Sequence, residues 1–93
     1  MTNEELRKSW AVTLRHLAAS RFFLLEHLPS QEAEDCWAQA QGFLHHNELG
    51  LGLEELQELG ELCSAPKEFW LELLLAAENM GLEAHSESLR QRL

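Results

Sequence analysis

Apolar residues recur every three or four positions along most of the chain, which is the spacing that gathers side chains on one face of an α-helix. Short breaks divide this pattern into helices predicted over residues 3–28, 31–46, 48–62 and 66–80, with a shorter helix after Gly81. Connections this short favour antiparallel packing of successive helices. The sequence therefore predicts an all-α fold, a single small bundle-like domain of four main helices plus a short C-terminal helix that takes in residues 1–93.

Residues suited to helix ends lie at the predicted breaks. Thr2 and Glu5 have the spacing of a capping box, and Ser30 can cap the second helix. Gly81 is expected to be the C-terminal cap of the fourth helix. Asn47 is expected to end the second helix, to cap the third, or to do both.

Three residues interrupt the apolar faces. Arg21 lies near the middle of the first stripe, so either the helix bends there or the side chain lies along the core and pairs with an acid. Gly52 and Gly60 lie on the packed side of the third helix, where glycine is unfavourable unless another helix approaches closely.

The composition agrees with a packed helical core. Hydrophobic residues make up 45% of the chain, which is too many for a disordered segment. Val12 is the only valine, and because β-strands favour β-branched residues, this favours helices. Leu71 and Leu75 lie opposite the core face of the fourth helix, so that helix is either central or presents apolar surface to a partner. The residues expected to be mostly buried are Trp10, Leu14, Leu17, Trp37, Phe43, Leu53, Leu56, Phe69, Trp70, Leu73 and Ala77.

Charge is the strongest compositional signal. Sixteen acidic residues against seven Lys and Arg give a formal net charge of −9, which disfavours binding to nucleic-acid phosphates. No Lys or Arg occurs between Phe22 and Pro66. These acids either keep the protein soluble or steer a basic protein partner. The residues expected to bind that partner are Glu34, Asp35, Glu48, Glu54, Glu55, Glu58 and Glu61.

The residues that could support chemistry do not form a recognisable site. His45 and His46 are adjacent, so on a helix they point about 100° apart, and no second Cys or His cluster completes a metal site. Cys36 and Cys63 fall on apolar faces, where a free cysteine behaves as a small hydrophobe. No nucleophile elbow or glycine-rich phosphate loop occurs. We therefore expect no catalytic residues, no metal, no cofactor and no enzymatic activity.

The first ten residues lack the basic-then-apolar arrangement of a signal peptide, and no apolar run reaches membrane-spanning length. The sequence therefore predicts a cytoplasmic protein that does not contact the membrane.

Three segments have a familiar residue order. They are Phe-Leu-His-His-Asn-Glu-Leu-Gly-Leu-Gly-Leu-Glu-Glu-Leu over residues 43–56, Phe69-Trp-x-x-Leu73, and Ala-Ala-Glu-Asn-Met-Gly-Leu over residues 76–82. Together they resemble the MafI-like immunity proteins of bacterial polymorphic-toxin systems, although Gly52 stands where that family is expected to have Ala.

The resemblance implies a protein that binds and neutralises a cognate toxin domain. It supplies no functional residues, so the choice of partner-binding acids depends on charge alone. The alternative hypothesis is an acidic helical chaperone or adaptor, or a regulatory subunit, for another protein.

Overall fold

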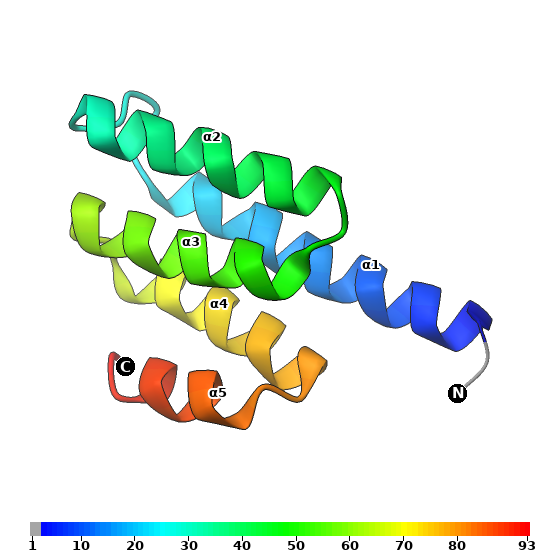
Figure 1. The fold of residues 1–93 in the computed structure, drawn as a ribbon. Coiled ribbons are helices and arrows are strands. Elements are labelled where there is room, and N and C mark those ends of the chain that lie inside the picture. The colour runs from blue at the N-terminus through cyan, green and yellow to red at the C-terminus, as the bar shows by residue number, and fades with distance from the viewer. Residues whose placement is uncertain (1–2) are drawn as a thin grey trace.

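The computed structural model describes residues 3–93, and these residues contain helices and no strand (Figure 1). The all-α fold class is therefore confirmed. The elements are α1 (Asn3–Ser20), the 3-10 helix η1 (Arg21–Phe23), α2 (Gln31–His45), α3 (Leu49–Cys63), α4 (Lys67–Met80) and α5 (Glu83–Arg90). Thr2, half of the expected capping box, lies outside the described residues.

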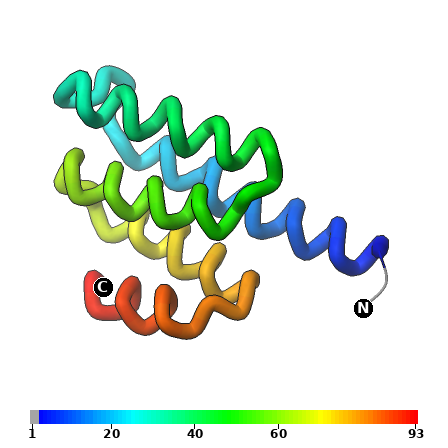
Figure 2. The backbone as a smooth tube through the Cα atoms, viewed as in Figure 1, coloured from blue at the N-terminus to red at the C-terminus, as the bar shows by residue number. Residues whose placement is uncertain are grey.

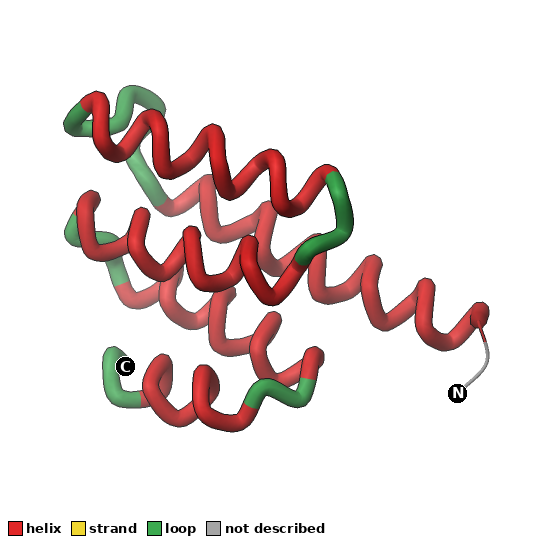
Figure 3. The backbone as a smooth tube through the Cα atoms, in the orientation of Figure 1, coloured by secondary structure: helices red, strands yellow, loops and turns green. Residues whose placement is uncertain are grey.

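Successive helices reverse direction, so the chain forms an antiparallel bundle (Figures 1 and 2). The most extensive packing is between α2 and α3 and between α1 and α4, while α5 packs against α4. The loops between α2, α3, α4 and α5 are short, and a longer loop over residues 24–30 leads into α2 (Figure 3).

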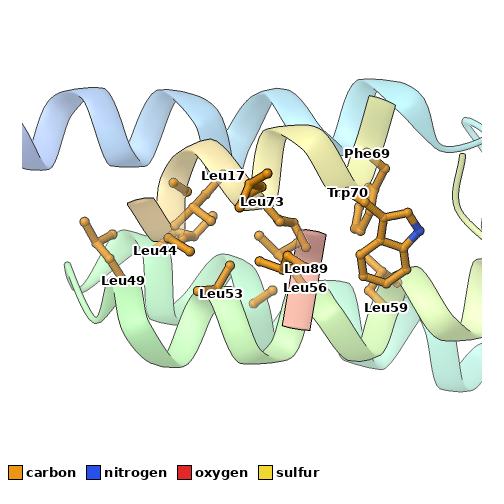
Figure 4. Close-up of a cluster of buried hydrophobic side chains, with 14 of the residues drawn as sticks. Leu17, Leu44, Leu49, Leu53, Leu56, Leu59, Phe69, Trp70, Leu73 and Leu89 are labelled. Atoms are coloured by element: carbon orange, nitrogen blue, oxygen red, sulfur yellow. The ribbon is translucent and has the colours of Figure 1, made fainter. Parts of the chain in front are cut away.

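Leucines from all five α-helices and an aromatic pair from α4 form much of the core (Figure 4). Most of the predicted core is confirmed, since the residues that are at most 5% exposed include Leu17, Leu53, Leu56, Phe69, Trp70, Leu73 and Ala77. Leu14 and Trp37 are half-buried against this core, and Phe43 is half-buried on α2.

Trp10 was expected in the core, and this prediction is wrong because its side chain is 45% exposed. The N-terminal part of α1 extends past the other helices (Figure 1). Trp10 precedes the buried Leu17 by seven residues, so both lie on nearly the same face of α1. Two turns earlier in α1, however, almost half of the Trp10 side chain is left exposed.

The first helix was predicted to reach residue 28, but α1 ends at Ser20. The buried Ser20 hydroxyl donates to the Leu17 carbonyl at 2.7 Å. The Arg21 guanidinium then donates to the carbonyls of Leu25 at 3.0 Å and Glu26 at 3.1 Å. These hydrogen bonds hold the backbone of residues 25 and 26 next to the Arg21 side chain. Arg21 therefore follows the end of α1 and does not lie at a bend within it, so the first expectation is wrong. Its half-buried side chain lies over the Trp37 ring at the edge of the core, but its head group bonds to carbonyls and pairs with no acid among residues 3–93, so the expected pairing is also wrong.

Three helices end in the same hydrogen-bonded arrangement, the Schellman motif. At the end of α2, the Asn47 N–H donates to the Leu44 carbonyl at 3.2 Å and the Glu48 N–H donates to the Phe43 carbonyl at 2.8 Å. The same pattern occurs with Ser64 after α3 and with Gly81 after α4. All three central residues have positive φ, which confirms Gly81 as a cap and places Asn47 at the end of α2.

The predicted close approaches at the two glycines of α3 are confirmed. A Cβ atom on Gly52 would lie 2.7 Å from Leu44, and one on Gly60 would lie 2.5 Å from Phe69 and 2.6 Å from Trp70. The expected cap of α2 is also present, since the Ser30 hydroxyl accepts from the Ala33 N–H at 3.1 Å.

We predict that Gly60→Ala destabilises the protein by about 1–3 kcal/mol, because the new methyl group has to displace two packed rings. The matched change Gly42→Ala lies on α2 where an added Cβ meets nothing within 4 Å. It should stabilise the protein by about 0.5–1 kcal/mol through helix propensity. Urea denaturation of both variants measures the two effects. Equal effects would contradict the close approach of α3 and α4.

We also predict that Asn47→Ala lowers the free energy of unfolding by about 1 kcal/mol, since alanine is strained at a φ of 58°. Asn47→Gly should retain the wild-type stability, because glycine adopts this conformation without strain. Thermal and urea unfolding compare the three proteins. An unaffected alanine variant would show that the backbone of the turn does not depend on Asn47.

Candidate protein-binding surface

The seven acids expected to bind a partner lie on α2, on α3 and in the turn between them. We call this set the acidic face: Glu34, Asp35, Glu48, Glu54, Glu55, Glu58 and Glu61. Six of the seven are exposed, and Glu55 is half-buried. Three of the exposed acids, Glu54, Glu58 and Glu61, follow one another at helical spacing along the outer side of α3.

The acids of α2 and α3 come from two helices that pack against each other. The Cys36 thiol donates to the Glu55 carbonyl oxygen at 3.2 Å, so the first half of α2 lies beside the middle of α3. Glu34 and Asp35 belong to the same part of α2 as Cys36, but on a helix their side chains point about 200° and 100° away from the Cys36 side chain that contacts α3. Glu48 lies apart from them, at the other end of α3, which is about 20 Å long.

Several of these carboxylates already have a hydrogen-bond or ion-pair partner within the chain. Glu54 lies 3.4 Å from the His85 ring on α5, and Glu61 pairs with Arg92 just beyond α5. Asp35 accepts a hydrogen bond from the Gln31 side chain at 2.8 Å. The charge of α3 is thus partly compensated on the side that faces the C-terminal segment.

Three other carboxylates of the acidic face have no hydrogen-bond or ion-pair partner in the described part of the chain: Glu34, Glu48 and Glu58. All three are exposed. They are the members of the acidic face whose charge remains available to a partner protein.

Cys36 lies beneath the acidic face and is only 7% exposed. Burial, followed by the hydrogen bond and the negative charge of Glu55, raises the pKa of its thiol to about 12. Burial also raises the pKa of Cys63. Because the thiolate is the reactive form, both environments oppose nucleophilic chemistry at neutral pH.

Among the His, Cys, Asp and Glu side chains of residues 3–93, Cys36, Glu55 and Glu58 form a group close enough to share a metal ion. Their potential ligand atoms lie within 4.8 Å of one another. A thiol binds zinc as thiolate, usually in a tetrahedral set of four ligands. Here the thiol donates a hydrogen bond to Glu55 and is held protonated, so this arrangement suits a structural contact rather than a metal site.

Sequence reasoning missed the exposed apolar residues that follow α1. Phe22 is 86% exposed and Leu25 is 77% exposed, and both follow the end of α1 at Ser20, within the helix predicted to reach residue 28. The signal that could have located them is Arg21, a charged residue within the apolar stripe. Leu71 and Leu75 on α4 are 44% and 36% exposed, so this helix does present apolar surface.

We predict that the stability of the protein falls with rising pH between about pH 9 and 12. The unfolded chain releases the Cys36 proton near its ordinary pKa of 9.0, whereas the native protein retains it up to about pH 12. In that window the unfolded state binds fewer protons, so this group lowers the free energy of unfolding by about 1.4 kcal/mol per pH unit.

Urea denaturation at pH 8, 9 and 10 compares the wild-type protein with Cys36→Ala. The variant should have the shallower pH dependence, and the absence of tyrosine leaves few other groups that titrate in this range. Identical slopes for the two proteins would contradict a protonated, buried thiol.

No helix among residues 3–93 is both long enough and apolar enough to cross a lipid bilayer. No family model, characterised protein or solved structure matches the chain.

Proposed function

We propose that this protein is an immunity protein that binds and neutralises a cognate bacterial toxin domain by direct contact through its acidic face. The observation that carries the proposal is the group of exposed carboxylates without partners, Glu34, Glu48 and Glu58, in a stretch that contains no Lys or Arg. The partner is expected to be basic where it meets these residues.

An exposed carboxylate without a partner in the chain can pair with a basic side chain of another protein. Complementary charge also raises the rate of encounter and orients the two proteins. Toxins that cleave or modify nucleic acids need basic clefts for the phosphates, and an acidic helix can occupy such a cleft. This supports a toxin of that kind as the partner.

The resemblance to MafI-like immunity proteins supports the same class of function. It covers about residues 40–82, and α3, which carries most of the acidic face, lies within that segment. Charge and residue order thus direct attention to the same helix. The toxin is expected to be encoded immediately upstream of the gene for this protein.

The test is a pair of double charge reversals. Glu34→Lys with Glu58→Lys changes the acidic face, and Glu68→Lys with Glu87→Lys changes exposed acids elsewhere. In each pair one residue lies in the first turn of its helix and the other lies further along a helix. Each pair changes the formal net charge from −9 to −5, since each Glu→Lys adds two units.

The acidic-face variant should associate with the upstream-encoded toxin domain at least about ten-fold more slowly, and it should no longer protect cells that express the toxin. The matched variant should protect like the wild-type protein. Surface plasmon resonance at two salt concentrations and a growth assay measure these effects, with circular dichroism as the control for folding.

If both variants bind and protect normally, the acidic face is a solvated surface and the proposal fails. In that case Leu71 and Leu75 on α4 are the next surface to test. Binding through the acidic face that leaves the toxic activity intact would favour the chaperone or adaptor hypothesis instead.

A further inference from the structure

A groove of about 790 Å³ lies between α1 and α2. It exists because α1 packs on α4 and α2 packs on α3, while α1 and α2 make little contact with each other. Ala18 on α1 and Trp37 and Gly42 on α2 contribute to its apolar walls, and Phe22 also lines it.

The charge of this groove is opposite to that of the protein as a whole. Its titratable lining residues are Arg21, His45 and His46, and no carboxylate lines it. The chain has sixteen acidic residues and seven Lys and Arg, so a lining with basic but no acidic side chains is a local reversal of charge. None of the acidic-face residues contributes to the groove, which makes it a separate surface.

Arg21 is held in place at this site with part of its hydrogen-bonding capacity unused. Its two terminal nitrogens donate to the carbonyls of Leu25 and Glu26, and its guanidinium lies 5.5 Å from the centroid of the Trp37 ring. A guanidinium has five N–H donors, so donors remain for a carboxylate supplied from outside the chain.

The exposed aromatic side chain indicates what kind of ligand fits. Phe22 is 86% exposed, so the groove is open to solvent at this residue rather than enclosed. A small-molecule pocket normally buries most of its ligand, which this groove cannot do. A groove between two helices with apolar walls is the type of surface that receives the apolar face of a third helix.

We propose that the groove between α1 and α2 binds an amphipathic helix of a partner protein, which places apolar residues against Trp37 and Phe22 and carboxylates against Arg21 and the two histidines. None of the acidic-face residues lines this groove, and its charge is opposite to theirs. Either proposal can therefore fail without the other.

The test uses the full chain and a fluorescein-labelled synthetic helical peptide of about 20 residues, with leucines on one face and glutamates flanking them. A second peptide has glutamine in place of each glutamate. Ala18→Gln places a long polar side chain in the groove, and Ala84→Gln makes the same change at an exposed position on α5. Fluorescence anisotropy measures binding, and circular dichroism checks that both variants are folded.

The wild-type protein and Ala84→Gln should bind the glutamate peptide saturably and equally. Ala18→Gln should bind it at least about ten-fold more weakly, because the walls of the groove can no longer close on the leucines. The glutamine peptide should bind the wild-type protein at least about ten-fold more weakly, because Arg21 loses its carboxylate partner.

A second matched pair of variants tests the groove in case Ala18→Gln does not fold. Phe22→Ala removes an exposed side chain at the groove, and Leu71→Ala removes an exposed side chain on α4. Only the first should weaken binding of the peptide. The proposal is overturned if neither groove variant weakens binding, if the glutamine peptide binds as well as the glutamate peptide, or if the wild-type protein does not bind. Self-association of the wild-type chain that Ala18→Gln abolishes would identify a second copy as the occupant and would also overturn it.

Discussion

The close approach of α3 and α4 at Gly60 is the contact on which the rest of the bundle depends. The absence of a side chain at Gly60 allows the rings of Phe69 and Trp70 to lie directly against the α3 backbone. The two rings pack edge to face with their centroids 5.2 Å apart, and the indole N–H of Trp70 donates to the Ala65 carbonyl at 3.1 Å. The same aromatic pair therefore fixes both the crossing of the two helices and the turn that joins them.

The other elements attach to this pair of helices. The Arg92 guanidinium lies 4.1 Å from the centroid of the Trp70 ring and also pairs with Glu61, so the segment after α5 is tied to both α4 and α3. On the far side, Asn79 donates to the Thr13 hydroxyl at 2.7 Å, which orients α1 on α4. Because α1 joins the bundle through α4 and α2 joins it through α3, the space between α1 and α2 remains open.

The helical fold could be predicted from the sequence because its signals are local. Apolar spacing located the five α-helices of residues 3–93, though not the 3-10 helix η1, and Ser30 and Gly81 marked two of the helix ends correctly. The end of α1 could not be predicted in this way, because the apolar spacing continues beyond Ser20. The helix stops there, and the Arg21 side chain bonds to the carbonyls of Leu25 and Glu26 in place of helical hydrogen bonds. The exposure of Trp10 depends on the length of α1 relative to its neighbours, which periodicity does not contain.

The candidate site was predictable to a smaller extent. Charge was enough to expect that the acids would be exposed, but the pairing of Glu54 with His85 and of Glu61 with Arg92 joins residues about thirty positions apart. Only the packed structure shows which carboxylates are left without a partner. The groove was missed for a related reason, since it lies between two helices that are adjacent in sequence but pack mainly on other helices.

The environment of the two cysteines determines how the protein can be labelled. With a pKa of about 12, one Cys36 thiol in roughly 10⁵ is ionised at pH 7, compared with about one in a hundred at the ordinary cysteine pKa of 9.0. Alkylating reagents follow the thiolate population, and burial raises the pKa of Cys63 as well. A cysteine introduced on the surface would thus react with a maleimide dye well ahead of Cys36. Cys36 would not first have to be replaced, so a fluorophore could be placed beside the acidic face or the groove with the buried contact of α2 on α3 unaltered.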